Sequence, residues 1–313
     1  TLYPTVESDG SFTINIPLYH HTQVRMMIGN ADLVILLSPE KETNVAINLS
    51  NPPGKQFVFS GQYATINNEW CQPELITKIP PVYSDGDLLD SIVGISANEF
   101  KKRCINQYKR YVTHNNAQLQ FSEDTRTLAN LSCAFDCLEN LQATHYCLQT
   151  AYQKKENITR EQAFAAFLDV YLPDDFHNYL KDFPVNHPLA LYCYNYRNVV
   201  MDLYDTHKDP LAYEKNLLKN APLTKEEQTL IHQYETAFKA GISFQQESEL
   251  MALSAKYFKE NDLFRWESFS KAKERLSNII QDSTSLIVDY IRAIYMRSSF
   301  YNLQPLKIGR AHV

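Results

Sequence analysis

The stretch "LANLSCAFDCLENLQATHYCLQTAY", residues 128–152, decides the fold because it is the clearest helix in the chain. Its large apolar side chains recur at spacings of three and four, which places them on one side of a helix that turns 100° per residue. We expect this seam to be buried along the whole stretch. A lone histidine among leucines is more often a packed core residue than a ligand, because function needs converging partners. The seam consists of Leu128, Leu131, Phe135, Leu138, Leu141, His145, Leu148 and Tyr152.

A second face of the same helix carries small residues. Measured around the helix from Leu131, Cys133 and Cys137 fall at about 200° and 240°. Free cysteine behaves as a small hydrophobic residue, so this face allows another helix to approach closely. We therefore expect a central helix that is packed on two sides. The small face also includes Ala129, Asn140, Thr144, Cys147 and Ala151.

The cysteine pair has three interpretations: packing, a disulfide, or half of a metal site. Zinc needs its ligand atoms within about 2.3 Å of one point, whereas Cys147 stands roughly 15 Å along the axis from Cys137. The spacing of Cys133 and Cys137 also differs from C-x-x-C, in which the first thiol lies at a helix start that lowers its pKa. Packing is therefore favoured. A redox-active Cys133–Cys137 pair remains an alternative.

The first 62 residues predict a β-rich domain. Apolar residues alternate with polar ones in short segments that are separated by glycine and proline, which is typical of antiparallel strands. We expect about five strands and a small antiparallel β-sandwich or half-barrel. The alternating positions are Phe12, Ile14 and Ile16; Val24, Met26 and Ile28; Leu33, Ile35 and Leu37; Val45, Ile47 and Leu49; and Phe57 and Phe59.

From about residue 63 the apolar period becomes that of helices. Residues 63–307 are predicted to form an all-α domain of seven to nine helices, so the fold class is α+β, mainly α. Residues 308–313 resemble the translation of a sequencing adapter, and we expect them to be an artefact. Two stripes and three helix starts support the prediction. The stripes are Phe100, Cys104, Tyr108, Tyr111 and Val112, and Leu276, Ile279, Ile280, Ile287, Tyr290, Ile291 and Ile294, and the starts are Thr159–Gln162, Asp209–Pro210 and Thr224–Glu227.

Composition excludes several classes of protein. The formal net charge of -6 leaves no general attraction to phosphate backbones. The basic cluster at 101–103 fits the solvent-exposed face of a helix. We therefore expect no nucleic-acid partner. The sequence contains no apolar run of the roughly 20 residues that a membrane span needs.

No residue is predicted to be catalytic, to bind a cofactor or to bind a metal. The G-x-S-x-G, H-E-x-x-H and P-loop motifs do not occur. Neighbouring strand residues point to opposite faces, so His20 and His21 are not expected to chelate. The carboxylate pairs 174–175 and 226–227 fit helix starts, where negative charge is favoured. The tyrosines suggest either helix packing, which is favoured, or an aromatic ligand surface, and they include Tyr192, Tyr194 and Tyr196.

Four stretches resemble the amino-terminal and helical regions of Bacteroidetes-type TlpA-like thiol-disulfide oxidoreductases, which belong to the thioredoxin family. The resemblance implies an exported protein of the cell envelope or periplasm, truncated here before a thioredoxin-like domain with a C-x-x-C centre. It assigns no catalytic residue to this chain, which has no C-x-x-C. The stretches are "DGSFTINIPL", "ADLVILLSPEKETNVAINLS", "FVFSGQYATINNEW" and "YLKDFPVNHPLALYCYNYRNVV".

The resemblance implies that the chain positions the missing domain or selects its disulfide-containing protein substrates. Such a domain exchanges disulfides when a thiolate of low pKa attacks the partner's disulfide. Whether the whole protein is an enzyme stays open at this point. The alternative is a non-enzymatic exported binding or scaffold protein.

Overall fold

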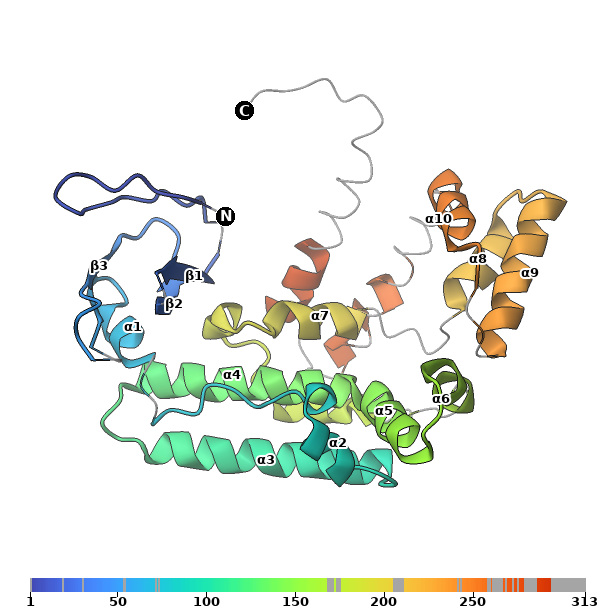
Figure 1. Ribbon diagram of the computed structural model, residues 1–313, viewed down its shortest axis with the longest axis horizontal. Coiled ribbons are helices and arrows are strands. Elements are labelled where there is room, and N and C mark those ends of the chain that lie inside the picture. The colour runs from blue at the N-terminus through green and yellow to red at the C-terminus, as the bar shows by residue number, and fades with distance from the viewer. Residues whose placement is uncertain are drawn as a thin grey trace, which may run out of the picture.

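The computed structural model covers most of the chain. It describes residues 2–257 apart from 19, 30, 53–54, 71, 73, 168–171, 173–175, 205–210, 241 and 243, and beyond them residues 260, 267, 269–271, 273–274, 276–278 and 286–293. Most described residues are helical, and the strands lie near the N-terminus, so the α+β, mainly α class is confirmed (Figure 1).

The β part consists of two antiparallel hairpins. β1 (Thr22–Ile28) pairs with β2 (Ala31–Leu37), and β3 (Thr43–Ile47) pairs with β4 (Phe57–Gly61). Both hairpins contribute side chains to one apolar cluster, in two separate two-stranded sheets. The cluster is built from Leu33, Ile35 and Phe59, with Val24, Met26, Leu37, Val45, Phe57 and Ala64 packed against it.

One predicted strand is not formed. Residues 12–16 keep the expected alternation, since Phe12, Ile14 and Ile16 are half-buried, but no other described backbone pairs with them. A strand exists only as part of a ladder, because its backbone groups need partners. The described residues therefore contain four strands and not five.

The helices outnumber the prediction of seven to nine. The shorter ones lack the long periodic stripes on which that count depended. The α-helices are α1 (Ala64–Trp70), α2 (Gly86–Ser91), α3 (Ala97–Ala117), α4 (Glu123–Gln142), α5 (Thr144–Glu156), α6 (Arg160–Phe167), α7 (Tyr196–Tyr204), α8 (Ala212–Asn220), α9 (Lys225–Lys239) and α10 (Glu247–Lys256), and the 3-10 helices are η1 (Val82–Ser84), η2 (Phe176–Asp182) and η3 (Pro188–Tyr192).

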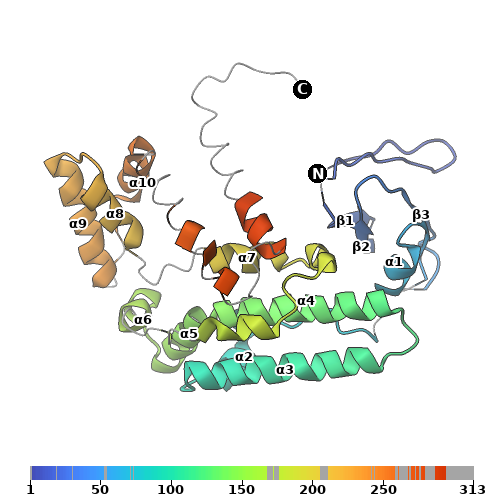
Figure 2. The same cartoon turned by 180° about the vertical axis from the view of Figure 1, so that it is seen from behind.

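Helix α4 lies at the centre of the main core, as predicted. It runs alongside α3, and the α7 region covers another side of it (Figures 1 and 2). Leu128, Leu138 and Leu141 are completely buried, and so is almost every other residue between 128 and 141. An amphipathic surface helix would bury only one stripe. The continuous burial therefore identifies α4 as the element around which the chain folds.

The predicted seam is interrupted at Ala143, where α4 ends and α5 begins. The Thr144 hydroxyl donates to the Leu141 carbonyl oxygen at 2.6 Å, and such a bond competes with regular helix hydrogen bonds. Beyond the break Cys147 is buried, whereas His145 is only half-buried and Tyr152 is exposed. The expectation of one buried seam through Tyr152 was therefore wrong.

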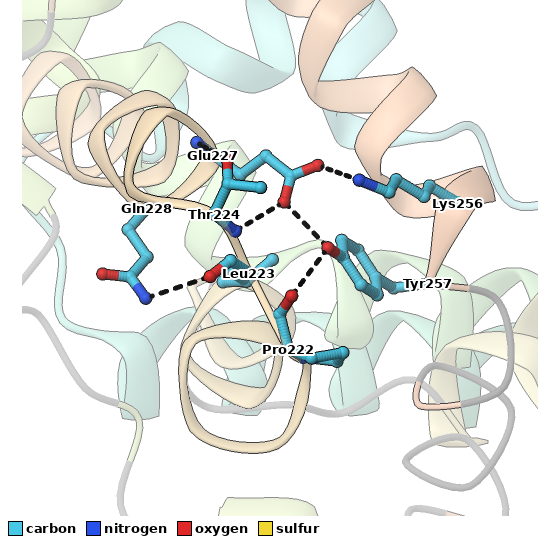
Figure 3. A network of polar contacts seen from close by, with 7 residues as sticks. All are labelled: Pro222, Leu223, Thr224, Glu227, Gln228, Lys256 and Tyr257. Carbon is cyan, nitrogen blue, oxygen red and sulfur yellow. Dashed lines mark hydrogen bonds and ion pairs between the residues drawn. The ribbon is translucent and has the colours of Figure 1, made fainter.

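Helices α8, α9 and α10 lie at one end of the molecule, away from α3 and α4 (Figures 1 and 2). They surround a separate small apolar cluster, and a network of polar contacts joins the start of α9 to the end of α10 (Figure 3). The capping box predicted at Thr224 and Glu227 is present, and Thr159 and Gln162 form the other. The small cluster consists of Leu217, Ile231, Leu253 and Tyr257.

The last predicted stripe is seen in part. Leu276, Ile287 and Ile291 are helical, buried and part of the main core. Residues 279, 280 and 294, the helix start at 209–210 and the expected artefact at 308–313 lie outside the described residues. Within the described chain, no helix combines the length and apolarity needed to cross a bilayer.

Candidate functional site

The cysteine pair that raised the question of redox chemistry is sealed in the core. Cys133 and Cys137 are 0% and 1% exposed, and both are free thiols. Burial raises the pKa of Cys133 to about 12 and that of Cys137 further above its ordinary value. Because the thiolate is the reactive species, neither side chain is an activated nucleophile. Burial has the same effect on the pKa of Cys104, Cys147 and Cys193.

An extended segment, residues 76–81, runs over the polar side of α4 and leads into η1, where we expected a second helix to pack on α4. The Cys133 thiol donates to the Ile76 carbonyl oxygen at 3.0 Å. Asn140 accepts from the Val82 N–H at 2.9 Å and donates to the Pro80 carbonyl oxygen at 3.2 Å. Cys133 thus acts as a hydrogen-bond donor that holds the segment.

The neighbouring helix α3 contributes to the same arrangement. The Asn115 side chain accepts from the Ile76 N–H and donates to the Ile76 carbonyl oxygen, both at 2.9 Å. The consecutive prolines Pro80 and Pro81 prevent this segment from joining a helix, so its buried backbone groups need side-chain partners. Cys133, Asp136 and Asn140 recur every three or four residues on one side of α4 and supply them.

Asp136 is the titratable member of this row, and it is 7% exposed. Its carboxylate accepts from the Ile79 N–H at 2.7 Å and from the Asn195 amide at 2.8 Å. The same Asn195 nitrogen also donates to Glu139 at 2.5 Å. Burial raises the pKa of Asp136 to about 6, while the two hydrogen bonds oppose the rise. This carboxyl group therefore titrates near neutrality inside the core.

A second polar cluster joins the β part to the helical part. The Ser38 and Tyr192 hydroxyls lie 2.9 Å and 3.1 Å from Nδ1 of His21. The His21 and Tyr192 rings are 5.1 Å apart, and Tyr63 lies edge-on to both. Burial, with a contribution from the neighbouring His20, lowers the pKa of His21, so the imidazole is neutral at pH 7.

This cluster brings together a serine, a histidine and a tyrosine, the side-chain types of proton-transfer chemistry. However, Ser38 is 6% exposed and Tyr192 1% exposed, so both side chains are largely shielded from solvent. The arrangement instead fastens the segment before β1 to η3. Sequence reasoning missed Ser38 and Tyr63, because no local signal connects residues so distant in the chain.

The other side chains considered from sequence take structural positions. His20 packs edge-on against Tyr290, whereas His21 contacts Tyr192, so the two histidines diverge as expected. Tyr192 and Tyr196 are buried, in agreement with packing, whereas Tyr194 is 82% exposed. In the basic cluster, the Lys101 ammonium lies over the Phe176 ring. Residues 174–175 lie outside the described residues, and residues 226–227 begin α9 as predicted.

Among the described residues, no group of three or more histidine, cysteine or carboxylate side chains is arranged to hold a metal ion. Comparisons with protein-family models, curated proteins and solved structures give no match for this chain.

Proposed function

We propose that this chain is the non-catalytic portion of an exported thiol-disulfide oxidoreductase. In this proposal it positions a thioredoxin-like domain or selects the domain's protein substrates in the cell envelope. The resemblance of residues 9–18, 31–50, 57–70 and 179–200 to TlpA-like proteins supports the assignment. The main supporting observation is the burial of Cys133 and Cys137, which makes both thiols unreactive. In this proposal another domain therefore performs thiol exchange.

The first test is thiol reactivity in the native chain. We expect the five described cysteines to resist alkylation by iodoacetamide until the protein is unfolded. Cys71 lies outside the described residues, so no resistance to alkylation is predicted for it. Its alkylation rate serves as the internal reference. Rapid native alkylation of Cys133 or Cys137 would contradict the proposal.

The second test is insulin reduction by this chain and by the intact product of its natural gene. We expect activity only from the intact product, through a C-x-x-C centre, and no change when Cys133 and Cys137 are both replaced by alanine. Activity of this chain that Cys133→Ala abolishes would assign the chemistry to the buried pair. An intact gene without C-x-x-C would favour the alternative.

The alternative is a non-enzymatic exported binding or scaffold protein. The large exposed apolar side chains in residues 2–58 support it, because a binding surface needs apolar groups that a partner can reach. A partner retained by the β part in the absence of any C-x-x-C domain is the outcome that supports it. These side chains are Leu2, Tyr3, Val6, Met27, Leu49 and Val58.

A further inference from the structure

The two hairpins have outer strand edges, and helix α1 covers two of them. The Asn67 side chain accepts from the Leu36 N–H at 2.8 Å and donates to the Leu36 carbonyl oxygen at 3.1 Å. Asn68 does the same for Phe59, at 2.9 Å and 3.1 Å. Each amide therefore replaces one residue of a neighbouring strand. Helix α1 thus occupies the outer edge of β2 at Leu36 and that of β4 at Phe59.

The other two edges differ in charge. β1 carries Arg25, whose Nε donates to Asp32 at 2.6 Å, and a charged residue on an edge discourages further pairing. In β3, Val45 lies opposite Phe59. Since the backbone of Phe59 points away from β3 toward Asn68, the backbone of Val45 points away from β4. Among the described strands, the uncharged β3 thus presents the one edge that is neither covered nor charged.

The chain also contains a segment suited to such an edge, and no described backbone group pairs with its residues 12–16. Residues 11–17 are extended and uncharged, with one half-buried apolar face and one exposed polar face. A tight turn precedes them, in which the Glu7 N–H donates to the Ser11 carbonyl oxygen and Gly10 has a φ of 84°. The apolar face consists of Phe12, Ile14 and Ile16.

We propose that the open edge of β3 is the binding surface for residues 11–17 of the same chain, which add to it as an antiparallel strand. His21 and Ser38, which touch, give both segments a common anchor. The chain advances five positions from Ile16 to His21 and five from Ser38 to Thr43, so each connection spans at most about 17 Å.

The anchor also fixes the direction and register of pairing. Residues 12–16 run toward the anchor and β3 runs away from it, so the pairing is antiparallel. Ile16 then lies opposite Thr43, Ile14 opposite Val45, and Phe12 opposite Ile47. This register places the apolar face of the segment beside the half-buried face of β3, whose burial alternates in the same way.

The added strand would complete the five-stranded sandwich and extend its apolar cluster. It would also cover an edge that is otherwise open to strand addition by other chains. Pairing within the chain is favoured over pairing with a second copy, because the short tether gives a high effective concentration. The inference is independent of the proposed thiol-disulfide function.

A pair of engineered cysteines tests the register. In the proposed sheet, Thr13 and Ala46 face each other as a non-hydrogen-bonded pair, with Cα atoms about 4.5 Å apart, which a disulfide can bridge. Both side chains are exposed, so the substitutions leave the core intact. We expect Thr13→Cys with Ala46→Cys to form a disulfide within one chain on mild oxidation, with loss of both engineered thiols.

The matched control combines Ile14→Cys with Ala46→Cys, which places the two thiols on opposite faces of the sheet. We expect this pair to stay reduced. Mass spectrometry identifies the linkage, and gel mobility separates linked monomers from linked dimers. The proposal is overturned if the Thr13 pair stays reduced, links two copies, or forms no more readily than the control.

Amide hydrogen exchange provides a measurement without new cysteines. The Val45 N–H is expected to be protected by residues 11–17, and Ile14→Asp should remove this protection because it places a charge on the apolar face. Thr13→Asp changes the outward face and should leave the protection unchanged. Equal exchange at Val45 in the wild type and in both variants would overturn the proposal.

Discussion

The α4 core and the α8–α10 cluster stabilise helices in different ways. Around α4, buried side chains such as Asn140 and Asp136 bind the backbone of an extended segment, inside a large apolar core. In the α8–α10 cluster the buried apolar residues that the structure describes are few, and the polar contacts of Glu227 (Figure 3) include an exposed lysine, Lys256. Buried hydrogen bonds are costly to break, whereas exposed ion pairs contribute little. We therefore expect global stability to reside in the first region.

The largest expected difference comes from truncating one fully buried leucine in each region. Leu138 in α4 and Leu217 in α8 are both completely buried. Leu138→Ala should lower the free energy of unfolding by about 2–5 kcal/mol, because it leaves a cavity in the main core. Urea denaturation monitored by circular dichroism measures this loss.

Leu217→Ala is the matched substitution in the small cluster. We expect faster amide exchange confined to α8–α10, with the main transition little changed, because such regions open separately from the core. If both variants lower the main transition equally, the two regions form one cooperative unit and the comparison fails.

The two regions should respond to pH with opposite signs. The pKa of Asp136 is raised to about 6, so its contribution to stability is complete below its unfolded value and is lost as the pH rises through 6. A shift of about two units corresponds to roughly 3 kcal/mol between pH 4 and pH 7. Glu227 behaves oppositely, because hydrogen bonding, first to Lys256, lowers its pKa to about 2. Its contribution is lost on acidification below its unfolded value.

Asp136→Asn isolates the first effect, because the amide keeps an acceptor for the Ile79 N–H and has no proton to gain. The difference in unfolding free energy between wild type and variant should change with pH between 4 and 6. His21 is present in both proteins, so its contribution cancels in this difference. A difference that is constant over this range would show that Asp136 does not titrate there.

Removing one buried amide should have the next largest effect. Asn140→Ala leaves the Val82 N–H and the Pro80 carbonyl oxygen without their partner, at a cost of about 1–3 kcal/mol. The control is Asn220→Ala at the exposed end of α8, whose side chain donates to that of Asn216. That change should stay within about 0.5 kcal/mol by thermal denaturation. Similar losses in both variants would contradict the role given to buried amides.

The same comparison explains what could be predicted from the sequence. Periodicity correctly indicated the burial of Leu138 and the small face of Cys133, because both follow from helix geometry. The extended segment on that face was not predictable, since the partners Ile76 and Asn140 are distant in the chain and carry no local signal. The break at Ala143 was missed because the apolar periodicity continues across it, while the Thr144 hydroxyl bond to Leu141 leaves no mark in that pattern.

The strands show the same limit. The alternation at residues 12–16 is real, but a strand also requires an edge to pair with, and a local pattern cannot identify that edge. The His21 cluster could not be predicted from the sequence for a similar reason, because Ser38 and Tyr192 reach it from separate elements. Residue patterns therefore predicted which face is buried, whereas the partner of each face is set by the fold.

The smallest expected effect belongs to the surface network of α9 and α10. The Lys256 ammonium lies 2.6 Å from Glu227, and Tyr257 donates to the same carboxylate at 2.8 Å. Glu227 also accepts from the Thr224 N–H, so it keeps two partners when the lysine is removed. In Lys256→Met, which retains an apolar stem, we expect slightly faster amide exchange at the start of α9, at low salt only. At about 1 M salt the screening length is about 3 Å, so wild type and variant should coincide. A salt-independent loss of amide protection as large as that caused by Leu217→Ala would instead show that this ion pair holds α10 in place. The α8–α10 cluster would then no longer differ from the α4 core in being held by few strong contacts.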